Sequence, residues 1–192
     1  MEPLALTTER PTTSDLLDEC RRGSREAMHT LYVENQRRVF SIAFNFFNGD
    51  CQKAEDVTQQ VFLTLLRRMD FRGDSQFTTW LYRITVNQCI DETRRSKRLL
   101  NLADWFTPAE PVSTGSLTDR FQSSELSAEV RVGLATLKPK YRMPIVLKYV
   151  EELSYQEIAD VLGISIGTVS SRMNRGLKLL AQKLGHLRDQ VH

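Results

Sequence analysis

The segment between residues 153 and 169 contains the pattern that most constrains how this chain can fold. Ser154 and Glu157 have the spacing of a capping box, in which each side chain accepts from a backbone N–H at a helix start. Four further residues follow at the intervals that two closely crossing helices require. They are the small residue Ala159, the turn glycine Gly163, the second cap Ser165 and the packing residue Val169. The pattern predicts a helix-turn-helix.

The second of these helices has an outward face that suits the major groove of DNA. Arginine can pair with guanine, asparagine can pair with adenine, and cations contact phosphates. Gly167 and Thr168, in the first turn, can offer N–H and hydroxyl groups to a phosphate. The expected DNA contacts further along are Ser170, Ser171, Asn174, Arg175 and Lys178, with Arg172 at the border of the face.

The alternative interpretation is an ordinary helical hairpin whose outer face is merely solvated. The distribution of charge distinguishes the two interpretations. Four basic residues and no acidic ones lie between Ser165 and Lys183, although the net charge of the chain is only +2. Together with the complete set of caps and packing residues, this segregation favours DNA binding over the alternative.

Apolar residues recur at helical spacing along nearly the whole chain, and strand signals are almost absent. The stretch from Thr107 to Ser124 differs, because its prolines, glycine and small polar residues leave little apolar surface to bury. We therefore predict an all-α protein with two small helical domains, residues 14–100 and 125–192. A flexible linker, 101–124, joins them, and residues 1–13 form a disordered N-terminus.

Three helices are expected in the first domain. A long one ends at Asn48-Gly49-Asp50, and Asp50 or a neighbour caps the next. The apolar stripe of that next helix is Ala54, Val57, Val61, Phe62, Leu65 and Leu66. A third places Phe77, Trp80, Leu81 and Ile84 inward. In the second domain, Pro144 should start or kink a helix, and Gly176 should weaken its helix by about 1 kcal/mol relative to alanine.

Several classes of function find no support in the sequence. Three cysteines far apart, Cys20, Cys51 and Cys89, fit neither a CxxC metal site nor a disulfide framework, and the histidines add no ligand spacing. There are no paired carboxylates in a plausible pocket and no glycine-rich phosphate loop, so an enzyme, a metal and a cofactor are not expected. No apolar run approaches the length of a membrane span, which predicts a cytoplasmic protein without membrane insertion.

Several motifs, in order, resemble those of the compact ECF (extracytoplasmic function) group of the sigma-70 family. Residues 54–62 are similar to its polymerase-binding motif, and residues 71–84 followed by Asn87 to its promoter-melting segment. Residues 137–142 and 167–172 resemble its second domain. The resemblance covers almost everything from Ser14 to Leu184 except the linker, and it implies a subunit that directs bacterial RNA polymerase to promoters.

The resemblance also implies site residues. Those that would dock on the coiled coil of the polymerase β′ subunit are Glu55, Asp56, Gln59, Gln60 and Phe62. The loop expected to hold a flipped base of the −10 element contains Phe71, Arg72, Gly73, Asp74 and Ser75. Strand contacts would come from the following helix, at Arg83, Asn87, Asp91, Arg94 and Arg95.

Further partners follow from the same resemblance. The second domain would bind the −35 element as duplex and touch the polymerase β flap, and an anti-sigma factor is the regulator expected for such a protein. The alternative is an autonomous helix-turn-helix regulator with a helical sensor domain. A dimer interface and a palindromic operator would favour it, whereas the long linker and the lack of an evident dimerisation stripe do not.

Overall fold

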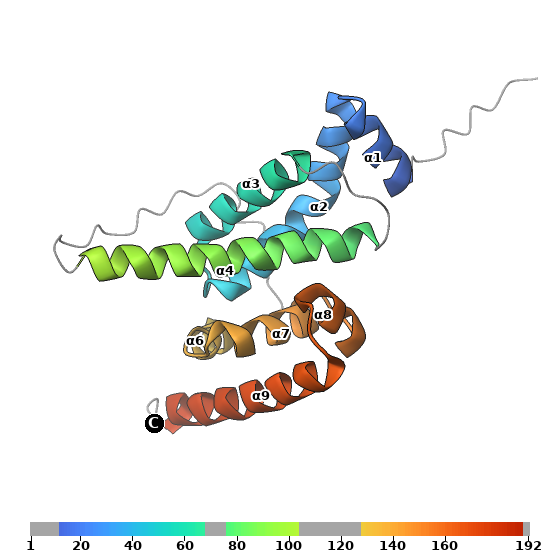
Figure 1. Ribbon diagram of the computed structural model, residues 1–192. Coiled ribbons are helices and arrows are strands. Elements are labelled where there is room, and N and C mark those ends of the chain that lie inside the picture. Colours follow the sequence, from blue (N-terminus) through green and yellow to red (C-terminus); the bar gives the residue numbers. More distant parts are fainter. Residues whose placement is uncertain (1–11, 68–75, 104–127, 190–192) are drawn as a thin grey trace, which may run out of the picture.

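The computed structural model describes residues 12–67, 76–103 and 128–189 of the chain. Within these ranges every regular element is an α-helix, in agreement with the predicted fold class (Figure 1). The elements are α1 (Thr13–Arg21), α2 (Arg25–Phe46), α3 (Cys51–Arg67), α4 (Phe77–Ala103), α6 (Ala128–Ala135), α7 (Pro139–Val150), α8 (Tyr155–Leu162) and α9 (Ile166–Asp189). No helix in the described part of the chain is long and apolar enough to cross a membrane.

Two helix ends overlap segments that were expected to be irregular. Thr12 caps α1 through a box with Asp15, so the last two residues of the predicted N-terminal segment, 1–13, belong to the start of this helix. Helix α4 continues to Ala103, three residues into the predicted linker, 101–124. The rest of that linker up to residue 124 lies outside the described residues.

Helix α2 is the centre of the N-terminal half, α1–α4, and packs against α1, α3 and α4. It ends at Phe46, where Asn48 and Gly49 take φ values of 61° and 85°, and Asp50 then accepts the N–H of Lys53 at 3.0 Å. The predicted end of the long helix at residues 48–50 and the predicted cap of the next helix at Asp50 are both confirmed. The expected inward residues of α3 and α4 are buried, with Trp80 half-buried.

Leu66 is the exception. Its side chain was assigned to the buried stripe of α3 but is 38% exposed. It lies at the edge of the stripe, one residue beyond the fully packed Leu65, and lines a hollow between α2 and α3.

In the C-terminal half, α6–α9, the proline that was expected to start or kink a helix, Pro144, lies inside α7. The helix begins at Pro139 and continues through a buried Pro144 to Val150, so Pro144 does not start it. Proline is favoured in the first turn of a helix because the N–H there needs no helical partner. Inside the helix the ring of Pro144 instead deprives the Lys140 carbonyl of its usual donor, a cost that burial of the apolar ring offsets.

Gly176 of α9 lies where α7 passes close by. A Cβ at Gly176 would lie 2.9 Å from Ile145 Cδ1 and 3.2 Å from the backbone oxygen of Tyr141. Residue 176 must therefore lack a side chain for α7 and α9 to approach this closely.

Substitution at Gly176 should show this constraint. Alanine ordinarily gains about 1 kcal/mol over glycine inside a helix, but the clash should cancel that gain in Gly176→Ala. At Gly185 nothing lies within 4 Å of a built Cβ, so Gly185→Ala serves as the matched control. We expect the free energy of unfolding, measured by urea titration, to be about 1–3 kcal/mol lower in Gly176→Ala than in Gly185→Ala. Equal free energies of unfolding in the two variants would show that α7 and α9 pack loosely at Gly176.

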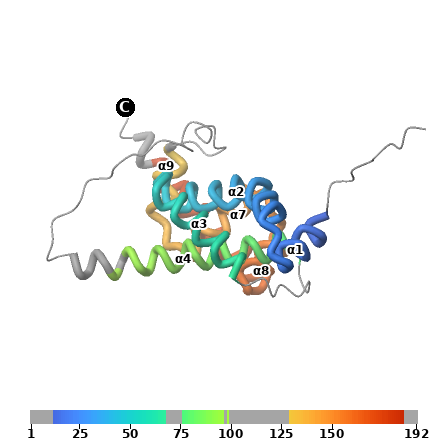
Figure 2. The backbone as a smooth tube through the Cα atoms, turned by 90° about the horizontal axis from the view of Figure 1, so that it is seen from above, coloured from blue at the N-terminus to red at the C-terminus, as the bar shows by residue number. Residues whose placement is uncertain are grey.

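The two halves form two stacked layers (Figure 1). Helix α2 packs against α6 and α7, and α4 packs against α8, so the buried apolar residues form one continuous core. Helix α9 lies on the outer side of the second layer, away from α4, and the C-terminal end of α4 extends beyond the other helices (Figures 1 and 2).

Candidate functional site

The start of α8 confirms the predicted capping box. Ser154 Oγ accepts the N–H of Glu157 at 3.2 Å, and Glu157 Oε2 accepts the N–H of Ser154 at 2.7 Å. These hydrogen bonds to Ser154 hold the pKa of the Glu157 carboxyl below its ordinary value, with a further contribution from the Lys148 ammonium. The carboxylate is thus the form that stabilises the helix start.

The turn between α8 and α9 also follows the prediction. Gly163 has φ 64°, the left-handed conformation that favours glycine, and the N–H of Ile164 donates to Ala159 O at 3.1 Å. Ser165 Oγ caps α9 by accepting the N–H of Thr168 at 3.2 Å, and Val169 is fully buried. The two helices therefore have the geometry of a helix-turn-helix.

The first turn of α9, where Gly167 and Thr168 were expected to offer N–H and hydroxyl groups to a phosphate, uses Thr168 in its cap. The N–H of Thr168 donates to Ser165 Oγ. The Thr168 hydroxyl also lies 2.9 Å from Ser165 Oγ, so this residue completes the cap. Gly167, which is exposed, is the remaining first-turn position for a phosphate.

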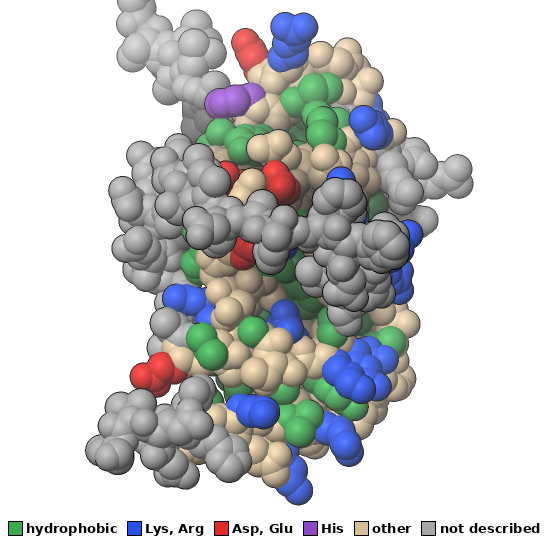
Figure 3. Space-filling model, turned by 90° about the vertical axis from the view of Figure 1, so that its left-hand side faces the viewer, with side chains coloured by type: hydrophobic (Ala, Val, Ile, Leu, Met, Phe, Trp, Pro, Cys, Tyr) green, Lys and Arg blue, Asp and Glu red, His purple; other side chains and the backbone are tan. Residues whose placement is uncertain are grey.

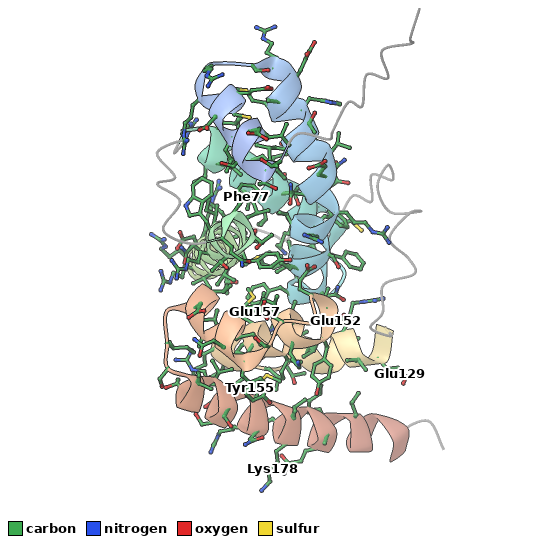
Figure 4. The ribbon with its side chains drawn as sticks, turned by 90° about the vertical axis from the view of Figure 1, so that its right-hand side faces the viewer. Phe77, Glu129, Glu152, Tyr155, Glu157 and Lys178 are labelled. Atoms are coloured by element: carbon green, nitrogen blue, oxygen red, sulfur yellow. The ribbon has the colours of Figure 1, made fainter. Side chains whose placement is uncertain are left out.

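The recognition face of α9, which we define as Ser171, Asn174, Arg175 and Lys178, is exposed at all four positions. Lys178 points away from the rest of the molecule (Figure 4). Ser171 donates its hydroxyl to Thr168 O at 3.0 Å, which leaves its oxygen lone pairs available as acceptors. Ser170 and Arg172 are half-buried at the two edges of this face.

A groove of about 500 Å³ runs beside the recognition face, between α9 and the N-terminal end of α7. Its charged lining residues are all cations, Lys138, Arg175 and Lys183. The other residues with polar side chains in its lining are Thr136, Tyr141 and Gln182. Lys and Arg side chains outnumber acidic ones over the lower, C-terminal part of the face shown in Figure 3. Sequence reasoning missed Lys138, because it lies 37 residues from Arg175 along the chain.

The predicted strand contacts share one face of α4. Arg83, Asn87, Asp91 and Arg94 are all exposed, and their spacing places them along one stripe, the strand stripe, with Arg95 beside it. Asp91 pairs with Arg94 at 3.3 Å. The Arg83 side chain is exposed but also binds a neighbouring helix, since its Nε donates to Asp160 O of α8 at 2.9 Å. The predicted base-holding loop, Phe71, Arg72, Gly73, Asp74 and Ser75, lies outside the described residues.

The predicted polymerase contacts lie on the outer side of α3. Asp56, Gln59 and Gln60 are exposed and Glu55 is half-buried. Leu63 is 43% exposed and follows Asp56 by two helical turns, so it continues the same face. We define the docking face as Asp56, Gln59, Gln60 and Leu63. Sequence reasoning did not include Leu63, although its seven-residue spacing from Asp56 was a usable signal.

Phe62 has a different position from the rest of its predicted group. Its side chain is 7% exposed and packs edge-on against Tyr32, with ring centroids 4.8 Å apart. It lines an apolar pocket of about 220 Å³ between α2 and α3, together with Met28, His29, Leu31, Tyr32, Leu65 and Leu66. Phe62 therefore lines this pocket rather than the docking face. Leu66, another lining residue, lies next to the docking face.

Family models and known relatives match both halves of this chain. The family model described as "Sigma-70 region 2" matches residues 31–99, and the one described as "Sigma-70, region 4" matches residues 127–180. The ECF RNA polymerase sigma factor SigW of Bacillus subtilis is 31% identical over 185 residues, which cover 89% of this chain and 96% of the relative. The ECF RNA polymerase sigma-E factor of Escherichia coli K12 is 32% identical, with 92% and 96% covered.

Two solved structures share the arrangement of helices. The sigma factor RpoE of Bartonella quintana, in complex with the anti-sigma factor NepR, matches 82% of this chain and 96% of its own with a TM-score of 0.65. At 22% identity this likeness concerns the fold alone. CnrH, in complex with the cytosolic domain of CnrY, matches 91% and 96% with a TM-score of 0.60 and 26% identity.

Proposed function

This chain belongs to the ECF group of the sigma-70 family, whose members direct core RNA polymerase to promoters, and we propose that it divides this task between its two halves. The N-terminal half, residues 14–100, binds core polymerase and recognises and melts the −10 element. The C-terminal half, residues 125–192, binds the −35 element as duplex. The single observation that supports the division best is the exposed recognition face of α9, on the side of the molecule opposite α4.

Readout of the −35 element rests on the chemistry of the recognition face. An α-helix fits the major groove, where Asn174 can pair with adenine and Arg175 with guanine. The cationic groove beside it would follow the phosphate backbone, because Lys138, Arg175 and Lys183 line one hollow. No acidic residue lines that groove to oppose a phosphate.

Melting of the −10 element requires no chemical catalysis, and we propose that the protein has no enzymatic activity of its own. Capture of unstacked bases, at about 1–3 kcal/mol per base, offsets the cost of opening the duplex. The strand stripe of α4 supplies two exposed arginines and Asn87 for this contact. The loop between residues 70 and 76 would hold a flipped base.

Polymerase binding is proposed for the docking face and its apolar rim. Asp56 and the two glutamines would complement basic groups on the β′ coiled coil, while Leu63 and Leu66 would supply the apolar contacts of the interface. The C-terminal half would contact the β flap. Since an anti-sigma factor would block transcription most directly by covering the same apolar surface, we propose one as a regulatory partner. The protein would act in the cytoplasm, where the polymerase is found.

One assay tests this function as a whole. The purified chain is added to core RNA polymerase and a promoter library, and run-off transcripts are sequenced. We expect a common pair of upstream elements to emerge among the transcribed templates. If the chain forms no complex with core polymerase, the proposed function is wrong.

Within this assay, Arg175→Ala tests base reading by α9. Loss of a bidentate arginine–guanine contact should weaken binding of the selected −35 duplex by about 1–3 kcal/mol and relax the sequence preference at one position. The measurement is a fluorescence-anisotropy titration at several fixed salt concentrations, using the selected sequence and single-base variants of it.

Two further variants separate base reading from phosphate contact. Arg175→Lys keeps the charge but loses the planar fork, so it should retain the salt dependence while losing the base preference. Lys183→Ala should weaken all sequences equally and reduce the magnitude of the salt slope by about 0.9. A uniform effect of Arg175→Ala on every sequence would assign that residue to the backbone instead.

A further inference from the structure

The cationic groove between α7 and α9 gathers three cations that have no partner within the described part of the chain. Lys138 comes from the N-terminal end of α7, and Arg175 and Lys183 come from α9. None of them forms an ion pair or a side-chain hydrogen bond with another described residue. Like charges that converge on one hollow repel one another, and a bound anion removes that cost. The groove is therefore suited to an anion.

The start of α7 adds positive potential at the same place. Lys138 occupies the N-cap position without a side-chain capping hydrogen bond, and the helix dipole places partial positive charge at this end. A fourth cation, Lys140, holds its ammonium 5.0 Å from the centroid of the Tyr141 ring, which lines the groove. A chain of phosphates is the kind of anion that can balance several cations gathered this closely.

The groove also has an apolar part, for which a phosphate backbone has no use. Leu137 and Leu179 line it together with the ring of Tyr141. Its volume, about 500 Å³, lies in the range of pockets that enclose small ligands, about 300–1,000 Å³. Apolar side chains with a few converging polar groups are typical of such pockets. A ligand that carries both a flat ring and a chain of phosphates matches this lining.

The walls of the groove are fixed by the tight packing of α7 on α9. A Cβ at Gly176 would lie 3.2 Å from Tyr141 O, so the two helices are in close contact at the residue next to Arg175. The Leu137 side chain is buried and that of Tyr141 is half-buried. The groove is therefore formed before a ligand arrives, which reduces the conformational entropy lost on binding.

We propose that the cationic groove binds a free nucleoside polyphosphate. Its phosphates lie among Lys138, Arg175 and Lys183, and its base lies over Leu137 and Leu179. Because Arg175 belongs both to the groove and to the recognition face, a bound nucleotide competes with the −35 duplex, so the concentration of the nucleotide sets how much protein can read DNA. The site goes beyond the proposed function, and only this competition rests on it.

Binding is measured by isothermal titration calorimetry of the full-length chain with two probes, adenosine triphosphate and inorganic triphosphate. Ionic strength is held constant with sodium chloride, because screening weakens any unspecific attraction of anions. We expect both probes to saturate one site, with adenosine triphosphate about tenfold tighter because its base buries apolar surface. Equal affinity for the two probes would show that the apolar part is not used, and would overturn the nucleotide site.

Two lysine variants locate the site. Lys138 and Lys183 are exposed, so Lys138→Ala and Lys183→Ala should keep the fold, which circular dichroism checks. Each should weaken binding of adenosine triphosphate about tenfold through loss of a charge-assisted hydrogen bond. The matched control is Lys53→Ala, which removes the same charge from α3 in the N-terminal half. We expect it to leave the affinity unchanged. Equal losses in all three variants would reduce the effect to net charge and overturn the site.

Competition with DNA is the second readout. In the anisotropy titration, adenosine triphosphate should displace the selected −35 duplex more strongly than sodium chloride at the same ionic strength. Displacement no greater than that by the salt, or the absence of calorimetric binding, would overturn the site and assign the groove to the DNA backbone alone. If the chain instead forms no complex with core polymerase, the proposed function fails, and calorimetry still decides the nucleotide site.

Discussion

Asp56→Arg is expected to reduce the affinity for core RNA polymerase at least about 30-fold, or about 2 kcal/mol. Asp56 is exposed on the docking face, which continues through Gln59, Gln60 and Leu63 on successive turns of α3. A cation at that position would meet the basic groups proposed on the partner, and like charges brought together in an interface cost several kcal/mol. The measurement is a competition titration against labelled wild-type protein.

Glu129→Arg is the matched control for this charge reversal. Glu129 is exposed on α6 and points outward from the C-terminal half (Figure 4). The Glu129→Arg substitution changes the net charge by the same amount as Asp56→Arg, so it controls for any long-range electrostatic effect on association. If the two variants lose equal affinity, the docking face is not where polymerase binds. Unaltered helical circular dichroism in both would show that the fold is intact.

Phe46→Ala is expected to lower the free energy of unfolding by about 3–5 kcal/mol, a large fraction of the stability of a typical domain. The Phe46 ring is fully buried, lies edge-on to Phe47 with centroids 5.1 Å apart, and packs against the Arg142 guanidinium. Its removal leaves a cavity where α2 meets α7, because the surrounding backbone can collapse only in part. Urea unfolding followed by circular dichroism measures the loss.

Val33→Ala provides the reference for Phe46→Ala within the same helix. Val33 is 49% exposed, so its truncation should change the free energy of unfolding by no more than about 0.5 kcal/mol. If Phe46→Ala unfolded in two separate transitions, the two halves would have lost their mutual stabilisation, as expected for a shared core. Similar midpoints for both variants would show that the contact between α2 and α7 adds no stability.

The helix-turn-helix could be predicted from the sequence almost residue by residue. Its caps at Ser154 and Ser165 and its left-handed Gly163 depend on short-range backbone geometry. Such requirements restrict which residue types are tolerated, so they are visible in a single sequence. The helix ends at Asn48 and Asp50 could be predicted for the same reason.

Other features depended on which helix packs against which face. Periodicity placed Leu66 in the core because it lies at the edge of an apolar stripe, but in the fold it lines a hollow between α2 and α3 and stays partly exposed. Pro144 inside α7 is tolerated because burial of its ring offsets the lost hydrogen bond, a balance that local rules do not include. The assembly of Lys138 with Arg175 and Lys183 in one groove likewise required the fold.

The sequence by itself determined the all-helical class, the helix-turn-helix and the residue types on the outer face of its second helix, since each follows from repeats or caps within a few residues. The tertiary structure alone decided that the two halves stack, that Arg83 is held by α8, and that Tyr82 meets Glu151, 69 residues away. Contacts between distant segments are set by complementary shape and hydrogen bonding across whole helix faces. No local pattern in a single chain encodes that pairing.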